Sequence, residues 1–282
     1  MKFGKLLKLC VVASAFTAVS AHANHPVFVE GNCLMAPFSA TQFTMVPPGT
    51  CGDYDGDGRI GIAEDMDGTD RVFGTIGAAL GAAGVNQNGR VVIVTSGVFP
   101  EVVTINPTTG NVTLEAAPGV EANIDAVLQG DPGNVARQAR PGVIVDAAEG
   151  TRVTLRNLVS RNWTVGIAVK NASHVTIEDC RVENNLNYGI QASGSAKVKI
   201  DKCSVTANGF RNDGPAAGSA PDGPANANPG GGIDFDDNSR GAVFRTNVSG
   251  NLAEGISGRN VITRDNYLFD NGRGDEHRGW VR

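Results

Sequence analysis

Apolar and polar residues alternate in short runs along the second half of the chain, and turn residues separate the runs. Such alternation is typical of half-buried β-strands, whose side chains point in turn to opposite faces. The runs Val153-Thr-Leu155, Val175-Thr-Ile177 and Val198-Lys-Ile200 repeat one version of this pattern. The pattern therefore predicts an all-β protein built from many short strands.

A period of about 23 residues organises these strands. Pairs of Gly-Ile or Gly-Val recur at intervals of 24, 23, 43 and 23 residues, beginning at Gly142, Gly166, Gly189, Gly232 and Gly255. A Val/Leu-x-x-Asn motif follows the same period and ends at Asn162, Asn185, Asn208, Asn251 and Asn271. One unit of this size cannot close a core alone, but stacked units pair each strand with the coils on either side. The period predicts a right-handed parallel β-helix solenoid with three strands in each coil.

The same period brings like residues of successive coils together. Asn185, Asn208 and Asn251 are predicted to stack at one corner, where their side chains hold the turns by hydrogen bonds. Cys180 and Cys203 are predicted to point into the core, reduced or bonded to each other, since buried cysteine behaves as a small apolar residue. Leucine-rich repeats would need many more leucines, and propeller blades need about 40 residues each.

The first 23 residues have the pattern of a secretory signal peptide. Three lysines precede an apolar run from Leu9 to Val19, and Ala21-His22-Ala23 supplies the small-x-small pattern of a cleavage site. The run is too short to cross a bilayer, and no later stretch is long and apolar enough to do so. We therefore expect a secreted or periplasmic protein that is cleaved near Ala23.

The balance of charge limits the classes of ligand. Removal of residues 1–23 takes away three lysines and no acids, which changes the formal net charge from −5 to −8. An acidic chain does not suit nucleic-acid binding, which needs a basic stripe. An acidic polysaccharide remains a candidate partner, because local basic residues or bridging calcium can hold one. Cys33 and Cys51 flank a loop-rich stretch, and a disulfide between them is expected in an oxidising compartment.

Residues 53–64 read D-Y-D-G-D-G-R-I-G-I-A-E and match the twelve-residue EF-hand loop. The expected Ca²⁺ ligands are four carboxylates and one backbone carbonyl, from Asp53, Asp55, Asp57, Glu64 and Arg59. A Pro-Gly stretch precedes the loop, so no helix enters it, and no second loop of this form follows. The arrangement resembles the isolated calcium loops of dockerin-like and other secreted proteins. It favours a structural ion over a sensor, with a merely acidic turn as the alternative.

Upstream of the repeat, residues 70–83 (DRVFGTIGAALGAA) predict a short amphipathic helix, and residues 89–105 predict two strands around a turn. The order F-x-TI-x-x-AL-x-AA, then VVIV-x-x-G-V-F-x-E-x-V-x-I, resembles the opening of pectin-lyase-like β-helix proteins, which include pectate lyases and pectinesterases. The resemblance covers roughly residues 66–275 and implies that the helix caps the N-terminal end of the solenoid. We expect an N-terminal extension over residues 24–69 and the β-helix over residues 70–282.

Polar residues are predicted to gather on the outer face of one sheet. Residues at fixed distances after the marker glycines are expected to point outward on this sheet in several coils. Residues 211–230 predict a loop inserted beside them. Function in solenoids concentrates at insertions on one face. The candidate catalytic residues on and around this face are Asp234, Asp236, Asp237, Arg245, Arg259 and Lys170. The alternative without a function is an ordinary exposed ion pair between Asp236 and Arg259.

Three chemistries fit this set of residues. In a lyase, a basic residue takes the proton beside a sugar carboxylate, while arginine or calcium neutralises that carboxylate. The basic residues available for these roles are Arg245, Arg259, Lys170 and Lys199. In a hydrolase, Asp234 would form a carboxylate pair with Asp236 or Asp237; in a pectinesterase, an aspartate would be the nucleophile. The three aspartates could also hold a second calcium ion.

The sequence contains none of the complete catalytic sets of related enzymes. Gly-His-Gly, Arg-x-Lys and Asp-Pro-His-Glu stretches are all missing, and His174 and His277 are interpreted as surface histidines. Two hypotheses stand: an enzyme such as a polysaccharide lyase acting on acidic polysaccharide, and a non-catalytic, calcium-stabilised surface or matrix protein that binds polysaccharide or cells. The C-terminal end lacks an obvious capping helix, so a monomer or a weak dimer through that edge is expected.

Overall fold

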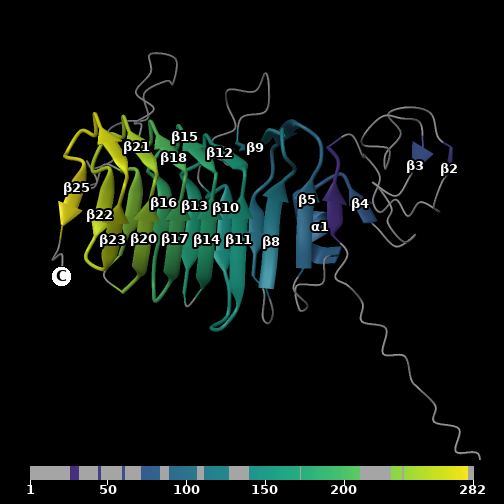
Figure 1. Cartoon of the computed structure of the whole chain (residues 1–282), viewed down its shortest axis with the longest axis horizontal. Coiled ribbons are helices and arrows are strands. Elements are labelled where there is room, and N and C mark those ends of the chain that lie inside the picture. The colour runs from purple at the N-terminus through teal and green to yellow at the C-terminus, as the bar shows by residue number, and fades with distance from the viewer. Residues whose placement is uncertain are drawn as a thin grey trace, which may run out of the picture.

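The structure is a computed structural model in which stacked three-stranded coils form one solenoid (Figure 1). It describes residues 26–31, 44–45, 59–60, 71–82, 89–106, 111–126, 140–171, 173–209, 230–236 and 238–278. Almost every described element is a strand, and the three large sheets are parallel. The protein is a right-handed parallel β-helix, which confirms the fold predicted from the 23-residue period.

Each coil contributes one strand to each of three sheets, in the chain order sheet 1, sheet 2, sheet 3. Sheet 1 runs β4 (Arg71–Phe73), β1 (Val27–Val29), β5 (Gly89–Ile93), β8 (Asn111–Ala116), β11 (Arg152–Arg156), β14 (His174–Glu178), β17 (Lys197–Asp201), β20 (Arg240–Phe244), β23 (Val261–Arg264). Sheet 2 runs β6 (Gly97–Phe99), β9 (Ala122–Asp125), β12 (Leu158–Arg161), β15 (Arg181–Glu183), β18 (Ser204–Thr206), β21 (Asn247–Ser249), β24 (Tyr267–Phe269). Sheet 3 runs β7 (Val103–Ile105), β10 (Val143–Asp146), β13 (Val165–Lys170), β16 (Tyr188–Ala192), β19 (Ile233–Phe235), β22 (Ile256–Gly258), β25 (Glu276–Arg278). A separate antiparallel pair joins β2 (Thr44–Met45) to β3 (Arg59–Ile60).

The core consists of aliphatic side chains stacked from coil to coil. In sheet 1, Leu155, Ile177 and Ile200 are direct register neighbours, and all three are fully buried. Full burial of a side chain of this size stabilises the folded state by roughly 1.5–3 kcal/mol. The residues that alternate with them along each strand point outward and are mostly polar, as the alternation in the sequence predicts.

In the coils from β11 onward, two corners are formed by single residues in the left-handed conformation. After the sheet 1 strand, φ lies between 48° and 56° at Asn157, Asp179, Lys202, Arg245 and Asp265. After the sheet 2 strand, φ lies between 53° and 63° at Asn162, Asn184, Ala207, Gly250 and Asp270. Asn, Asp and Gly tolerate this conformation best, which accounts for their frequency in the repeat.

Buried asparagines form a ladder along one corner. The side-chain amide of Asn185 donates to Asn208 at 2.8 Å, that of Asn208 to Asn251 at 3.0 Å, and that of Asn251 to Asn271 at 2.9 Å. The stack predicted for the first three residues is confirmed, and Asn271 extends it. The ladder also explains the marker glycines, because a Cβ atom on Gly189 would lie 2.7 Å from the amide nitrogen of Asn208.

The Val-x-x-Asn motif is out of register by one residue in its first coil. Ser160, not the preceding valine, pairs with Val182, so Trp163 occupies the position equivalent to Asn185. The backbone N–H of the fully buried Trp163 donates to the Asn185 side chain at 3.1 Å. Asn162, the residue that the motif aligns with the ladder, forms a left-handed corner instead.

The N-terminal coils differ from the sequence prediction. Helix α1 (Ile76–Ala82) is shorter than the predicted range 70–83, because Arg71–Phe73 forms β4. β4 pairs with β1 (Val27–Val29), which the domain prediction assigns to the N-terminal extension, and β1 also pairs with β5. The pairings of β1 with β4 and with β5 satisfy the backbone N–H and C=O groups of these strands. If residues 71–73 were helical and residues 27–29 detached, these groups would need other partners. Residues 89–105 likewise form three strands instead of two.

Helix α1 packs against β1, β4, β5 and β7 of the N-terminal coils. Ile76 and Ala79 are fully buried in the main core, and Leu80 is nearly so. The carboxylate of Glu101 accepts hydrogen bonds from the first helical N–H groups, at 2.7 Å from Ile76 and 2.9 Å from Gly77. Glu101 therefore caps the helix that covers this end of the core.

Cys180 and Cys203 stack inside the solenoid, one coil apart. Both are buried and neither forms a disulfide. The hydrogen bond with Cys203, followed by burial, raises the pKa of the Cys180 thiol well above its ordinary value. The predicted core stack is confirmed in its reduced form.

Several predictions concern residues that the structure does not describe. They are the signal peptide at 1–23, the cysteines Cys33 and Cys51, the calcium ligands Asp53, Asp55, Asp57 and Glu64, most of the loop at 211–230, and Asp237. Of the calcium loop, only Arg59 and Ile60 are described. Within the described part of the chain, no helix is long and apolar enough to cross a membrane.

Candidate functional site

Two of the aspartates that the sequence predicts as catalytic lie at one strand of sheet 3: Asp234 is in β19, and Asp236 directly follows it. β16, β19 and β22 place Gln191, Asp234 and Ser257 side by side, in the predicted register. The Ser257 hydroxyl donates to Asp234 Oδ1 at 2.7 Å, and Gln191 Nε2 donates to Oδ2 at 3.4 Å. Burial raises the pKa of Asp234, and the charges of Asp236 and Glu254 raise it further, while the two hydrogen bonds oppose the rise.

Asp236 is held by the backbone of its own turn. Its carboxylate accepts N–H groups of Gly194 at 3.0 Å, Asn238 at 3.2 Å and Ser239 at 3.1 Å. The Ser239 hydroxyl also donates to the Asp236 carbonyl oxygen at 3.0 Å. These bonds tie the turn after β19 to the preceding coil, so the geometry gives Asp236 a structural role.

Two of the three predicted basic residues, Lys170 and Arg259, lie in or directly after strands of sheet 3, as these aspartates do, and Arg245 does not. Arg245 lies at the corner between sheets 1 and 2, where its Nε donates to Asp201 at 2.9 Å. Lys170 is exposed at the end of β13, and Arg259 is exposed after β22. Arg245 does not lie on the face of Asp234, because Arg245 follows a sheet 1 strand and Asp234 is in sheet 3.

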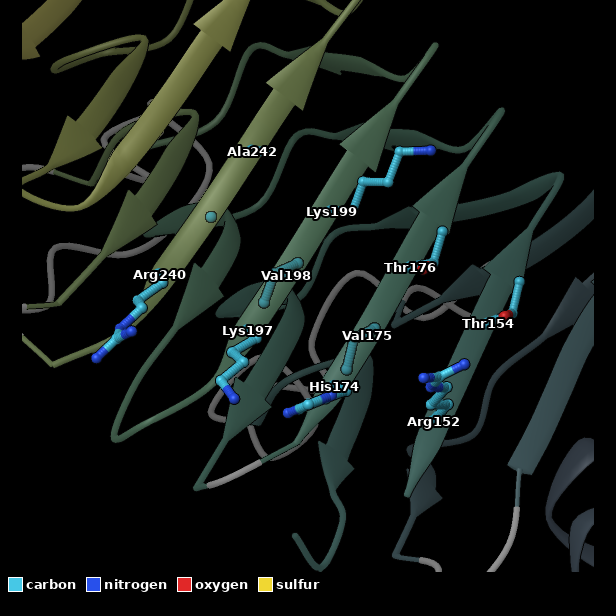
Figure 2. Close-up of a pocket in the computed structure, with 11 residues that line it drawn as sticks. Arg152, Thr154, His174, Val175, Thr176, Lys197, Val198, Lys199, Arg240 and Ala242 are labelled. Atoms are coloured by element: carbon cyan, nitrogen blue, oxygen red, sulfur yellow. The ribbon is translucent and has the colours of Figure 1, made fainter. Parts of the chain in front are cut away.

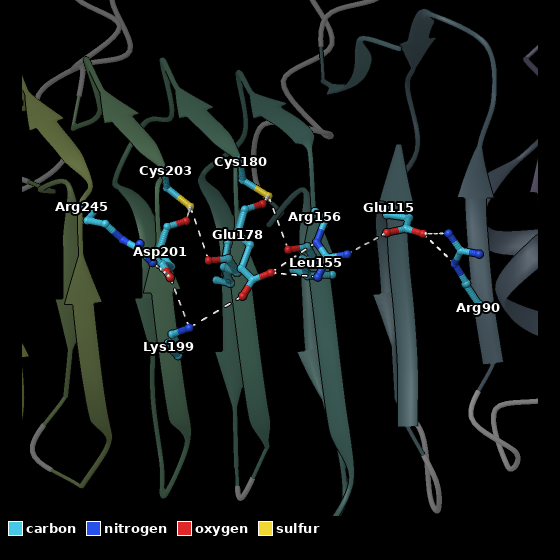
Figure 3. Close-up of polar contacts among 11 residues, drawn as sticks. Arg90, Glu115, Leu155, Arg156, Glu178, Cys180, Lys199, Asp201, Cys203 and Arg245 are labelled. Atoms are coloured by element: carbon cyan, nitrogen blue, oxygen red, sulfur yellow. Dashed lines mark hydrogen bonds and ion pairs between the residues drawn. The ribbon is translucent and has the colours of Figure 1, made fainter. Parts of the chain in front are cut away.

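One outward file of sheet 1 contains Glu115, Arg156, Glu178 and Asp201, and its acids are all bonded to cations (Figure 3). In this paired file Glu115 is bonded to Arg90 and Arg156, Glu178 to Arg156 and Lys199, and Asp201 to Lys199 and Arg245; Arg90, Lys199 and Arg245 reach it from neighbouring positions. The hydrogen bond from Arg245, together with Lys199, lowers the pKa of Asp201. Exposed pairs of this kind contribute about 0.2–1 kcal/mol each, and here they neutralise one side of the sheet.

A second outward file of sheet 1 carries basic residues on four consecutive strands. The first residues of β11, β14, β17 and β20 are direct register neighbours, namely Arg152, His174, Lys197 and Arg240. We call them the basic file; Figure 2 shows their side chains on the outer face of sheet 1. Adjacent strands are about 4.8 Å apart, so the cations repeat at that spacing. Within the described part of the chain, none of the four forms an ion pair with an acidic side chain.

A groove of about 660 Å³ lies along the basic file. Its remaining lining comes mainly from the next outward file, which contains Thr154, Thr176, Lys199 and Ala242. Three of these side chains are short, so they leave a hollow between the basic file and the paired file. The groove thus combines fixed cations with hydroxyl groups on rigid strands.

The sequence patterns do not select the basic file, and they interpret His174 as a surface histidine in a turn. In the structure His174 is the first residue of β14 and lines the groove. A usable signal was present, because Arg152, His174 and Lys197 directly precede the three repeated strand motifs. Arg240 carries no such signal, since Gly241 and Ala242 break the motif in its coil.

Coil architecture and strand register define the class of this protein as a right-handed parallel β-helix. Residues 141–279 match the family model described as right handed beta helix region. No curated protein matches the chain.

Similar solved structures include two kinds of protein. Pectate lyase Pel9A is 13% identical, with a TM-score of 0.34 over 84% of this chain and 67% of that chain. Pectin methylesterase from Aspergillus niger, in a penultimately deglycosylated form, is 14% identical, with a TM-score of 0.32 over 76% of this chain and 84% of that chain. Its deglycosylated form is 13% identical, with a TM-score of 0.30 over 75% and 84% of the respective chains.

Proposed function

We propose that this protein binds an acidic polysaccharide along the groove of sheet 1. The observation that carries the proposal is the basic file, a row of basic residues on four consecutive coils without an acidic partner among the described residues. A rigid row of like charges suits an extended polymer that repeats an anionic group along its length. The groove threonines, Thr154 and Thr176, add hydroxyls that can bond to sugar hydroxyls.

The surrounding charge supports a local and selective site. The whole chain is acidic, with a formal net charge of −5, so long-range attraction does not favour polyanions in general. On sheet 1 the paired file is neutralised by its own salt bridges, whereas the basic file is not. A bound polyanion would therefore be held at the groove and not over the neighbouring surface.

The test is a variant in which Arg152, Lys197 and Arg240 are all replaced by Gln. Isothermal titration with polygalacturonate and with alginate should show weaker binding, by about 5- to 150-fold, because three exposed charge contacts of about 0.3–1 kcal/mol each are lost. A matched control replaces three exposed cations outside the groove, Lys202, Arg264 and Arg273, by Gln. If both variants lost the same affinity, the loss would come from the change in overall charge and not from the groove, and the proposal would be overturned.

Cleavage of such a polymer is a second candidate function, and Asp234 is the observation that favours it. A half-buried carboxyl with a raised pKa is suited to act as a general acid. Product release from acidic polysaccharides, with calcium and with chelator, would be followed by mass spectrometry of the oligosaccharides. Unsaturated ends would indicate a lyase, and their loss in Asp234→Asn would place the chemistry at sheet 3. No product from any polymer, with the protein folded, would leave binding as the function.

We also propose that residues 53–64 bind one structural Ca²⁺ ion and that residues 1–23 direct export, with cleavage near Ala23. The first proposal rests on the spacing of the carboxylates in the sequence, and the second on the basic start and apolar run. Export would bring the groove into contact with extracellular or envelope polysaccharides. Mass spectrometry of the protein recovered from culture medium or periplasm would locate the cleavage.

A further inference from the structure

The basic file contains one residue of a different chemical kind. Arg152, Lys197 and Arg240 carry side chains that stay charged to well above neutral pH, whereas a histidine ordinarily gains or loses its charge near pH 6.5. His174 occupies an inner position of the file, between Arg152 on β11 and Lys197 on β17. The charge of the row therefore depends on pH at one inner place.

The groups around His174 leave its charge available to a ligand. From the two strands packed against β14, the charged groups in register with it are the cations Arg152 and Lys197. On β14 itself, the next outward residues are Thr176 and Glu178. His174 forms no ion pair with an acid among the described residues.

The nearest acid on the same strand is already occupied. Glu178 lies four residues along β14, in the paired file, where Arg156 holds it at 2.9 Å and Lys199 at 3.7 Å. Its charge is balanced there by two cations. An anionic group bound over the basic file would therefore be the first acidic partner of His174 in this groove.

We propose that His174 makes binding at this groove pH-dependent: with a protonated imidazole the file is an unbroken row of four cations, and with a neutral imidazole it is interrupted at its second position. The inference rests on the proposed function, because it concerns the regulation of the same groove. With a neutral imidazole, Arg152 and Lys197 are separated by two coils, about 9.6 Å, instead of by successive steps of about 4.8 Å. An anionic polymer that contacts each coil is held more tightly at acidic pH and released more readily at neutral pH.

The experiment uses the full-length mature protein and dextran sulfate, whose sulfate groups stay ionised across the range tested. The dissociation constant is measured from pH 5 to pH 8 at constant ionic strength. For the wild type we expect binding to weaken by about two- to fivefold as pH rises, the loss of one exposed charge contact. His174→Arg should bind tightly at every pH, and His174→Gln should bind weakly at every pH.

Two controls separate the outcomes. His277→Gln removes a histidine of β25, outside the groove, and should keep the wild-type profile. Titration in two buffers of different ionisation enthalpy should show proton uptake on binding by the wild type and none by His174→Arg. A wild-type profile in both His174 variants would overturn this inference. If, at pH 5, the triple Gln variant binds as tightly as the wild type, the proposed function itself fails.

Discussion

At the scale of single residues, the buried asparagines show how polar groups can stabilise a solenoid core. Asn208 accepts hydrogen bonds from the backbone N–H and the side-chain amide of Asn185, at 3.1 and 2.8 Å. It donates to Val182 O at 3.2 Å and to the Asn251 side chain at 3.0 Å. Every polar atom of the Asn208 side chain is thereby satisfied although the residue is fully buried.

Replacing Asn208 by Leu should lower the free energy of unfolding by about 3–5 kcal/mol, because buried donors of Asn185 and the Val182 carbonyl lose their partner. The matched control is Asn271→Leu, at the end of the ladder, where the residue is partly exposed and the loss should be smaller. Urea denaturation of both variants gives the comparison. An Asn208 variant no less stable than the Asn271 variant would show that the ladder contributes little.

Asp234 gives a second prediction at this scale. Its pKa is raised by burial, so the charged carboxylate is less stable in the folded protein than in the unfolded chain. This cost is present at neutral pH and disappears as pH falls through the folded-state pKa. Asp234→Asn should therefore raise the melting temperature at pH 7, and the difference should shrink towards pH 3. An equal difference at both pH values would contradict this electrostatic origin.

At the scale of elements, one side chain controls how the N-terminal helix begins. Glu101, between β6 and β7, supplies both carboxylate oxygens to the first N–H groups of α1. Glu101→Ala should cost about 0.5–2 kcal/mol and speed amide exchange at Ile76 and Gly77, since capping losses have this size. Glu121→Ala, which removes an exposed ion pair with Arg181, is the control and should leave exchange in α1 unchanged. Unchanged amide exchange at Ile76 and Gly77 in the Glu101 variant would show that Glu101 does not cap the helix.

The calcium loop is predicted to act as a stabilising element of its own. Chelation of Ca²⁺ should lower the melting temperature of the mature protein, because an ion that binds only the folded state stabilises it by mass action. A variant with Asp55→Asn and Glu64→Gln should melt at the lower temperature with or without chelator. Equal melting of the wild type in both conditions would favour the acidic-turn alternative.

At the scale of the whole molecule, the two ends of the solenoid differ. The N-terminal end is covered by α1, whereas the last described coil exposes Ile262 and Tyr267, each by 67%. Tyr267 and Phe269 contact each other at 4.8 Å between ring centroids. β23, β24 and β25 are the outermost described strands at this end, and edges of this kind can pair with another chain.

A weak dimer through this end is therefore our expectation for concentrated solutions. Light scattering at rising protein concentration should show an increasing mean mass, and Ile262→Lys with Tyr267→Lys should abolish the increase by placing like charges at the contact. Lys202→Glu, on an earlier coil, should not abolish it. A single monomeric mass at all concentrations would exclude the dimer.

Prediction from sequence succeeded where a feature repeats with the coil. The aliphatic stack, the ladder of Asn185, Asn208 and Asn251, and the register of Gln191, Asp234 and Ser257 all follow from counting residues. It failed where the pattern has no period. Arg71–Phe73 reads as a helix turn but pairs as a strand with Val27–Val29, a contact between distant segments that local pattern cannot indicate.

The sequence by itself determined the architecture, because a 23-residue period with strand alternation has one stable way to bury its apolar face. Only the tertiary structure decided which outward residues are free to bind. Arg245 and Arg152 are both exposed cations in the sequence pattern, yet Arg245 is neutralised by Asp201 on the preceding coil, whereas Arg152 lies in a row of basic residues. The difference arises because charge balance depends on neighbours one coil away, and those neighbours depend on the register of whole strands.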